Sequence, residues 1–393
     1  MRIAYVCADP GVPVFGCKGS SIHVQEVVSA LTRIGATVKL LASTIGGETP
    51  MGLEHVEVHK LPKFSGDQDI SVFSANDALR DKLEQTGPFD LVYERYSLWS
   101  FAAMEYTRSL GIPGLLEVNS PLIEEQVRYR HLLDPILAER VADRAFRAAN
   151  VLIAVSDGVA TYLTRYPHLR EKVNVVPNGV NPKRFPDDLK ASRPAAPRIF
   201  TVGFVGSLKP WHGLPILVKA FSDLHRKAPN TRLLIVGDGP ERSELVKELV
   251  EENLLDSTEI TGAVAPSEVP GLLASMDVAV APYPKLEHFY FSPLKVYEYM
   301  AAGLPVVASS LGQLTELIHD DVNGMLIPAG DHRALAIALD RLRRDPRLGK
   351  RLGHAARETV LRKHSWDSVV SRILELGGFG KAQKASLRGE LRN

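Results

Sequence analysis

The segment SPLKVYEYMAAGLPVVAS, which begins at Ser292, combines a lysine and a glutamate with the expected start of a helix. Ser292 is a suitable N-cap, Pro293 suits the first helical position, and Gly303 is expected to end the helix. The unpaired N–H groups at such a start attract anions, and Lys295 would add a full positive charge. Glu298, one turn further on, can accept hydrogen bonds from two neighbouring hydroxyl groups, as on a ribose. These residue types favour a site for the phosphates and ribose of a nucleotide.

The same two side chains also allow a simpler interpretation. Lys295 and Glu298 lie three positions apart and can form an ion pair on the solvated surface of a helix. Lysine before glutamate is the weaker order for such a pair, which makes this explanation less attractive. The local pattern leaves both interpretations open.

Two further stretches place glycines next to predicted strands. In VFGCKGSS, Gly16 and Gly19 precede a predicted helix that Ser20 or Ser21 is expected to cap, and they let the backbone approach a ligand closely. IVGDGPER places Gly237 and Gly239 after an apolar run, but a proline follows and the third glycine of a dinucleotide fingerprint is absent. Taken singly, the first stretch is better explained as a flexible turn between a strand and a helix, and the second is equally well explained as an ordinary connection of an α/β fold.

Strand-like and helix-like runs alternate along the chain. In the first half we expect strands at 2–7, 37–43, 55–61, 90–96, 113–119, 150–156 and 173–179, with helical patterns at 21–35, 74–86, 99–110 and 133–149. After a Pro- and Ala-rich stretch the alternation resumes, with strands at 199–206, 231–237, 258–262, 278–283, 305–309 and 324–328. This alternation predicts an α/β protein with two doubly wound parallel sheets.

The pattern also predicts how the chain is divided. We expect a Rossmann-like domain over 1–185, a linker over 186–197 and a second Rossmann-like domain over 198–365. A helix over 366–376 is expected to pack back on the first domain, and 377–393 to form a flexible tail.

Composition narrows the class of partner. The 393 residues exceed one ordinary core, and 47 Lys and Arg against 46 Asp and Glu give a net charge of +1, so we expect no nucleic-acid partner. The first apolar run is too short for a signal peptide, and no later run reaches the roughly 18 apolar residues of a membrane span. Cys7 and Cys17 alone cannot form a disulfide framework, and we expect a cytoplasmic protein.

Several of these segments together resemble the retaining glycosyltransferases of family 4, which have the GT-B fold. The resemblance rests on the segment from Ser292 and on GCKGSSIHVQEVVSAL at 16–31, PNGV at 177–180, FVGSLKPWHG at 204–213, IVGDGPER at 235–242 and NGMLIPAGD at 323–331. These segments occur in the family's order over nearly the whole chain. The resemblance implies two domains facing across a cleft. It also implies transfer of a hexose or amino-sugar from a nucleoside diphosphate to an acceptor hydroxyl, with retention at the anomeric carbon.

The resemblance assigns the ribose contact to Glu298, the second glutamate of the family's pair. The first glutamate is replaced by Tyr290, so we expect Tyr290 or the nearby Glu287 to take over its contact with the donor sugar.

The resemblance also assigns the diphosphate contact to the loop after the second domain's first strand. Many members carry an arginine and a lysine there, where this chain has Ser207 and His212. We expect Lys209 to be the main cation, with Lys295 as its helper.

We therefore expect Lys209, Lys295 and Glu298 to be catalytic. Other donor-binding residues implied are Gly19, Gly206, Ser207, His212, Gly237, Gly239, Val264, Tyr290, Ser292 and Leu294. On the acceptor side, where predicted strands of the first domain end, the candidates are Lys18, Ser20, Arg95, Glu117 and Asn119. The family often has a histidine here, and His131 is a weak candidate for it.

We expect a nucleotide-sugar donor, a UDP-sugar by family frequency, and an acceptor that is a small molecule, a glycan or a lipid-linked sugar. DQD at 67–69 has the form of a metal-binding carboxylate pair, but the family does not need one, so we expect no metal or other cofactor. Arginines between 128 and 147 are interleaved with acidic residues, which favours a solvated helix face over contact with an anionic membrane.

Two other functions fit the same residues. A nucleotide-sugar 2-epimerase on the same fold would need acid and base carboxylates but no second substrate. A non-catalytic partner that binds nucleotide sugars would explain Tyr290 and the missing arginine and lysine of the phosphate loop.

Overall fold

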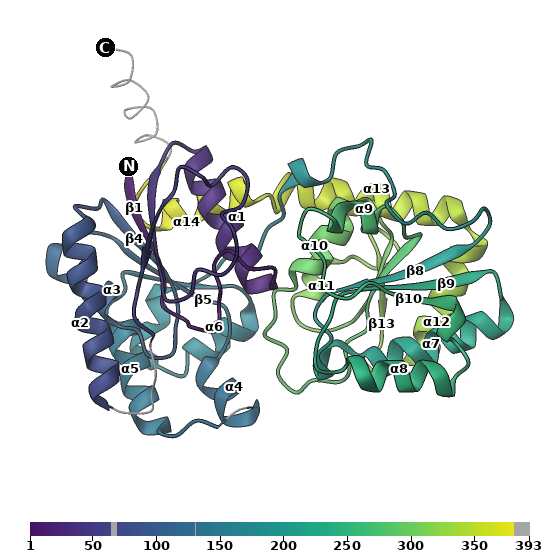
Figure 1. The fold of residues 1–393 in the computed structure, drawn as a ribbon, viewed down its shortest axis with the longest axis horizontal. Helices are drawn as coiled ribbons and strands as arrows, with labels where there is room; N and C mark the ends of the chain where they lie inside the picture. Colours follow the sequence, from purple (N-terminus) through teal and green to yellow (C-terminus); the bar gives the residue numbers. More distant parts are fainter. Residues whose placement is uncertain (64–68, 130, 381–393) are drawn as a thin grey trace, which may run out of the picture. The chain divides into compact units, whose positions relative to one another are not determined.

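The computed structural model describes residues 1–63, 69–129 and 131–380, and the chain forms two compact units (Figure 1). The first unit comprises Met1–Asn178 with Tyr290–Ser292 and the C-terminal segment from Trp366. The second comprises Gly179–Phe289 and Pro293–Ser365.

The first unit is built on a seven-stranded parallel sheet with the order β3-β2-β1-β4-β5-β6-β7. Its strands are β1 Arg2–Cys7, β2 Thr37–Ala42, β3 Glu57–Lys60, β4 Leu91–Arg95, β5 Gly114–Val118, β6 Val151–Ala154 and β7 Val173–Val175. Its helices are α1 Gly19–Arg33, α2 Asp69–Thr86, α3 Ala102–Leu110, α4 Leu122–Tyr129, α5 Pro135–Ala148, α6 Asp157–Leu163 and α14 Trp366–Leu376. The strand order reverses between β1 and β4, as in a doubly wound fold.

Helix α14 lies beside α1 within this unit (Figure 1). The buried ring of Trp366 meets the edge of His23, with the ring centroids 5.1 Å apart. Arg33 at the end of α1 donates hydrogen bonds to the carboxylate of Asp367. An aromatic contact and an ion pair thus help to hold the last helix to the first.

The second unit has a six-stranded parallel sheet with the order β10-β9-β8-β11-β12-β13. Its strands are β8 Phe200–Val205, β9 Thr231–Val236, β10 Thr258–Ile260, β11 Val278–Ala281, β12 Val306–Ser309 and β13 Met325–Ile327. Its helices are α7 Leu214–Lys227, α8 Arg242–Glu251, α9 Val269–Leu273, α10 Leu294–Ala301, α11 Leu314–Leu317, α12 His332–Arg344 and α13 Pro346–Lys363. Strands β11 and β12 are buried at every position, as expected for parallel strands covered on both faces.

The predicted fold class is confirmed, since both sheets are parallel α/β sheets. The chain divides at a different place from the one predicted, because Val180 donates its N–H to His364 and bridges Ser365 in the second unit. The predicted linker at 186–197 also lies against that unit: the N–H of Ser192 bonds to Gly271, and that of Arg193 to Ser275. Of the predicted tail, 381–393 lie outside the described residues.

Two predicted helix caps are wrong. Helix α10 begins at Leu294 with Pro293 as its N-cap, because the Ser292 hydroxyl instead accepts a hydrogen bond from the N–H of Asn178. Helix α1 begins at Gly19, not after Ser20 or Ser21, because the carbonyl of Lys18 already accepts the N–H of Ile22.

Candidate functional site

In the second unit, the strand order reverses between β8 and β11. Ligands of open parallel sheets bind outside the carboxyl ends of the strands at this point. The loop from Gly206 to Gly213 follows β8 here, and helix α10 contributes Lys295 from the chain that follows β11. The structure therefore brings together the residues predicted to meet the diphosphate.

Two glycines let the loops after β8 and β9 pack closely. Gly206 has φ +147° and Gly237 has φ +140°. A Cβ on Gly237 would lie 2.0 Å from the carbonyl oxygen of Gly206, and one on Gly239 would lie 2.4 Å from that of Leu208. Close backbone packing thus explains Gly237 and Gly239 without any ligand.

Lys295 points from α10 toward β8 and is half-buried. Its Nζ lies 4.3 Å from the ring centroid of Phe204 and 5.8 Å from that of Tyr283. A Cβ on Gly206 would lie 2.9 Å from the same Nζ, so the ammonium adjoins the backbone at the carboxyl end of β8. Burial lowers the pKa of Lys295 to about 7. Among the described residues, no carboxylate lies within ion-pair distance of this group.

His212 supplies no positive charge to the loop. Burial and the neighbouring charge of Lys295 lower the pKa of His212 to about 2, so its imidazole is neutral. Its Nδ1 donates a hydrogen bond to the carbonyl of Ser207, and its ring packs near Phe204 and Tyr283. Lys209 precedes the short helix Pro210–His212, with its Nζ 5.8 Å from the ring of Trp211. The loop therefore offers one lysine, and α10 offers a second.

Glu298 does not pair with Lys295 on the helix surface. Its Oε1 accepts a hydrogen bond of 2.6 Å from Nη1 of Arg184, and the two side chains are 17% and 19% exposed. Nη2 of Arg184 donates to the carbonyl of Pro266 at 2.8 Å. The surface ion pair considered as the simpler interpretation of Lys295 and Glu298 is thus not formed. Arg184 was not predicted, because its partners lie far away in the sequence.

In the first unit, the predicted acceptor-side residues Arg95 and Glu117 meet a histidine of α1 at the carboxyl ends of β4 and β5. Nε2 of His23 on α1 lies 3.1 Å from Oε1 of Glu117, and both side chains are 2% exposed. Nη1 of Arg95 lies 3.4 Å from Nδ1 of the same imidazole. Burial alone would raise the pKa of Glu117, but His23 and Arg95 hold it below its usual value. Glu117 is therefore an internal counter-charge, and Arg95 is the partly exposed member of the group.

Sequence reasoning did not single out His23. His131, the weak candidate, is exposed. The signal for His23 was its place in SIHVQEVV, next to the apolar face of a predicted helix.

The other acceptor-side candidates lie at the same edge of the first sheet, on loops or in the first turn of α1. Lys18 donates a hydrogen bond of 3.3 Å to the carbonyl of Gly11, and a Cβ on Gly19 would meet no atom within 4 Å. The Oδ1 of Asn119 is buried and makes no hydrogen bond to any described residue. Ser20 follows in the first turn of α1 and is partly exposed.

The remaining donor-side candidates are more dispersed. The ring of Tyr290 packs against the core of the first unit, and its carbonyl accepts a hydrogen bond from Ser156, while Glu287 is exposed. Their contact with the donor sugar stays a prediction. Val264 lines a cavity of about 380 Å³ in the second unit with Thr261 and Ser267, and Leu294 begins α10.

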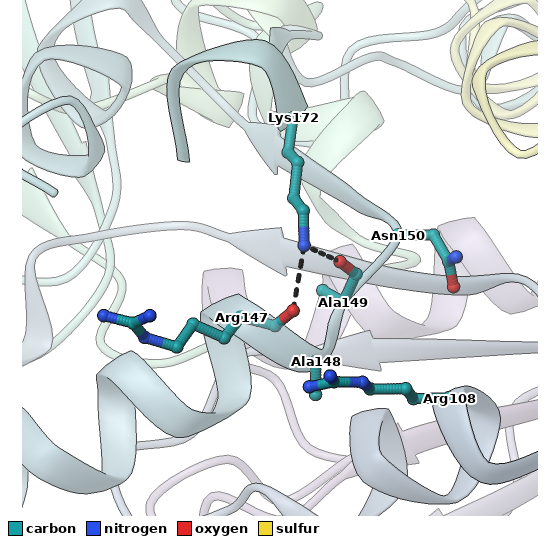
Figure 2. Close-up of a pocket in the computed structure, with 6 residues that line it drawn as sticks. All are labelled: Arg108, Arg147, Ala148, Ala149, Asn150 and Lys172. Carbon is teal, nitrogen blue, oxygen red and sulfur yellow. Dashed lines mark hydrogen bonds between the residues drawn. The ribbon is translucent and has the colours of Figure 1, made fainter. Parts of the chain in front are cut away.

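A larger cavity, of about 470 Å³, lies in the first unit next to the start of β6 (Figure 2). Lys172 there donates hydrogen bonds to the carbonyls of Arg147 and Ala149 and so satisfies the end of α5. The Arg147 side chain extends away from Lys172 in Figure 2 and pairs with Asp143. The Lys172 ammonium at this cavity thus serves the helix end.

Within the described ranges, no group of three potential metal ligands is found, and no helix is long and apolar enough to cross a membrane. Of the DQD segment at 67–69, which was considered as a metal-binding carboxylate pair, residues 67 and 68 lie outside the described residues.

Comparison with known proteins defines the class. Residues 18–184 match the family model "Glycosyltransferase Family 4", and residues 199–345 match "Glycosyl transferases group 1". The chain belongs to the family 4 glycosyltransferases, and its two parallel-sheet units have the GT-B fold.

Particular relatives cover nearly the whole chain. The D-inositol 3-phosphate glycosyltransferase of Stackebrandtia nassauensis is 27% identical over 400 residues, which span 93% of this chain and 87% of the relative. Sucrose-phosphate synthase from Thermosynechococcus elongatus has a similar structure, with a TM-score of 0.73, 23% identity and coverage of 96% of this chain and 98% of that one. HepE from Anabaena in complex with UDP has a TM-score of 0.72, 20% identity and coverage of 95% and 99%. The chain is therefore similar over 93% of its length to a glycosyltransferase, and its fold resembles that of a protein solved with UDP.

Proposed function

We propose that this glycosyltransferase moves a hexose or amino-sugar from a nucleoside diphosphate, with UDP as the first candidate, to an acceptor hydroxyl. We further propose that the anomeric configuration is retained and that no metal is needed. The observation that carries the proposal is the position of Lys295. Its half-buried ammonium lies against aromatic rings at the carboxyl end of β8, with no carboxylate partner among the described residues.

A diphosphate at this place would provide the missing counter-charge. The departing nucleoside diphosphate gains negative charge as the bond to the sugar breaks, so a fixed cation stabilises the transition state more than the ground state. Lys209 adds a second cation from the loop after β8. Because Lys295 is the lysine whose ammonium lies against Phe204 and Tyr283, we reverse the expected ranking and assign Lys295 the leading role and Lys209 the supporting one. Two lysines near the diphosphate support a reaction that needs no metal.

Glu298 supports a nucleotide rather than a simple sugar phosphate. Arg184 occupies Oε1 of its carboxylate, and Oε2 has capacity to accept a ribose hydroxyl. UDP is favoured because HepE, a structural neighbour, was solved with UDP. The base and the sugar are chosen by likeness and not by a residue of this chain.

The acceptor is assigned to the first unit. We assign Arg95 and Asn119 to acceptor binding. Lys18, at the end of the loop before α1, and Ser20, in the first turn of α1, are assigned to the same role. Glu117 acts behind Arg95 through His23, since its side chain is buried.

Retention requires no dedicated protein base in this scheme. The acceptor oxygen bonds to the anomeric carbon on the face from which the diphosphate leaves, the carbon–oxygen bond to the diphosphate breaks, and the acceptor proton passes to the departing phosphate oxygen. The products are a glycoside and a nucleoside diphosphate. Fixed charge and exclusion of water are then the main contributions of the protein.

The test begins with a thermal-shift panel of UDP, GDP, ADP and dTDP, followed by turnover of the matching nucleotide sugar. Lys295→Met keeps most of the side-chain volume but removes the charge, and Lys209→Ala removes the second cation. Each is expected to lower kcat/KM about tenfold or more, equivalent to about 1.4 kcal/mol of transition-state stabilisation. Lys350→Ala, an exposed lysine of α13, is the matched control and should have wild-type kinetics.

Product analysis separates this proposal from the alternatives. Incubation with a UDP-sugar alone would reveal a 2-epimerase by conversion of the sugar, whereas a transferase gives only slow hydrolysis. Full activity in Lys295→Met would remove the main support for the proposed site.

A further inference from the structure

Arg184 joins two parts of the second unit that are distant in sequence. Its guanidinium donates through Nη1 to Glu298 on α10 and through Nη2 to the carbonyl of Pro266, in the loop between β10 and α9. The two hydrogen bonds measure 2.6 and 2.8 Å. One side chain therefore fixes a carboxylate and a loop at the same time.

The arginine is itself held in place. It ends the short helix Pro182–Arg184, whose first turn is capped by the side chain of Asn181. Its Cζ lies 5.5 Å from the ring centroid of Phe185, which is fully buried. A planar guanidinium on an anchored backbone holds its two acceptors in a fixed relation, which the single ammonium of a lysine cannot do.

This contact is more than an ordinary surface ion pair. Such pairs contribute little when both groups are exposed, but here about four-fifths of each side chain is buried, at 17% and 19% exposure. Without the arginine, the Glu298 carboxylate would lose its partner and could rotate, and the loop would lose a tie to α10. Glu298 is also the residue assigned above to the ribose.

We propose that Arg184 is a positioning residue for the donor nucleotide: it aims the Glu298 carboxylate at the ribose and ties it to the loop 261–268. The inference rests on the proposed function, because it takes the ribose as the partner of Glu298. The loop carries Val264, one of the donor-binding residues that the family resemblance implies. Arg184 thus couples recognition of the ribose to the shape of the loop beside it, without itself touching the sugar.

A contact with the ribose is made in both the ground state and the transition state. Loss of its alignment should therefore raise KM for the donor, with a smaller change in kcat. Lys209 and Lys295, which act on charge developed during the reaction, should instead change kcat. This difference separates Arg184 from the residues assigned to the diphosphate.

The experiment compares two nucleotides that differ only in the hydroxyls that Glu298 would bind. The first is whichever of UDP, GDP and ADP binds the wild-type protein most tightly, and the second is its 2′,3′-dideoxy form. Dissociation constants are measured by calorimetry for wild type, Arg184→Lys, Arg184→Gln, Glu298→Ala and the double variant Arg184→Lys/Glu298→Ala. Arg341→Lys, which alters an exposed pair with Asp321, is the matched control.

We expect Arg184→Lys and Arg184→Gln to weaken binding of the ribonucleotide about tenfold and that of the dideoxy form less than about twofold. In the Glu298→Ala background, Arg184→Lys should cause no further loss, because both changes remove the same contact. Equal losses for both nucleotides, or additive losses in the double variant, would assign Arg184 a purely structural role and overturn the inference.

A different result would overturn the proposed function instead. If Glu298→Ala binds the ribonucleotide as tightly as wild type, or if none of the three nucleotides binds, Glu298 does not hold a ribose. The two failures are therefore distinguishable in one set of titrations.

Discussion

The ammonium of Lys295 lies 4.3 Å from the ring centroid of Phe204 on β8, and Glu298, one turn along the same helix, pairs with Arg184. Lys295 and Glu298, which their spacing along the helix would allow to pair with each other, thus interact with different residues. Aromatic faces attract a cation but do not neutralise it. The arrangement leaves a half-buried positive charge at the switch point of the second sheet, ready for an anion.

The first prediction concerns how nucleotide binding depends on pH. Burial lowers the pKa of Lys295 to about 7, so its ammonium is present below that pH and is lost as the pH rises through it. A bound diphosphate favours the charged form and raises this pKa, so binding above about pH 7 takes up a proton. We expect the Kd for UDP to increase about tenfold from about pH 6.5 to about pH 8.5. Calorimetry in buffers of different ionisation enthalpy measures both the Kd and the proton uptake.

Lys295→Met is the control for this prediction. It cannot take up the proton. Its Kd for UDP should therefore be larger than that of wild type at low pH and nearly independent of pH over the same range. The ionisation of UDP itself is common to both proteins and cancels in the comparison. Identical pH profiles for the variant and wild type would contradict the assignment.

The second prediction concerns stability. The pKa of Lys295 is lowered from 10.5 to about 7 on folding, so between these values the unfolded chain binds more protons than the folded one. The contribution of Lys295 to the free energy of unfolding therefore rises with pH across that window. Lys295→Met should make the empty protein more stable by about 1 kcal/mol below pH 7, after allowance for partial solvation of the side chain, and this gain should vanish toward pH 10. Urea unfolding at several pH values measures the difference.

A gain that is the same at all pH values would contradict this explanation, since methionine could also stabilise through packing alone. A loss of stability at pH 6 would contradict it as well. If the predicted result is found, the charged lysine is retained at a cost to the fold, as expected for a functional residue.

The strands could be predicted because their apolar composition alone nearly determines that they form strands. VAVA at β11 and VVAS at β12 are buried on both faces, and such apolar runs between helical patterns allow few other structures. The paired Rossmann-like sheets followed from the same alternation. Helix starts were less accurate, because Ser292 had a tertiary partner in Asn178 that local pattern does not contain.

The site was predicted in its residue types more than in its contacts. Periodicity places Lys295 and Glu298 one turn apart, but it does not say that one turns toward β8 and the other toward Arg184. Arg184 and Glu298 are 114 residues apart, so no local rule connects them. His23 was hidden for another reason, since a histidine beside the apolar face of a helix is usually an ordinary core residue.

The third prediction separates a glycine needed for packing from one needed for function. Gly237→Ala would place a Cβ 2.0 Å from the carbonyl oxygen of Gly206 at a φ of +140°, so we expect a loss of about 3 kcal/mol in stability. Gly19→Ala meets no atom within 4 Å and should leave the melting temperature within about one degree of wild type. If a ligand approaches the start of α1 closely, Gly19→Ala should still lower kcat/KM.

Thermal melts and donor turnover on the same two proteins check this contrast. A Gly237→Ala protein as stable as wild type would show that the loops after β8 and β9 can separate without cost. Wild-type turnover in Gly19→Ala would remove Gly19 from the donor-binding residues.

The fourth prediction concerns the buried pair in the first unit. Glu117 and His23 are each 2% exposed, and Arg95 approaches the far nitrogen of the same imidazole. Glu117→Ala removes the negative charge that faces His23 and Arg95. We therefore expect the free energy of unfolding to fall by about 3 kcal/mol. Glu105→Ala, which removes a partly exposed partner of Arg144, should cost less than about 1 kcal/mol.

The more conservative Glu117→Gln keeps a hydrogen-bonding group beside His23. In this variant donor hydrolysis without acceptor should be unchanged, while transfer to acceptor should fall because Arg95 is no longer aligned. Equal losses of hydrolysis and transfer would show that the pair supports the first unit as a whole and not the acceptor side.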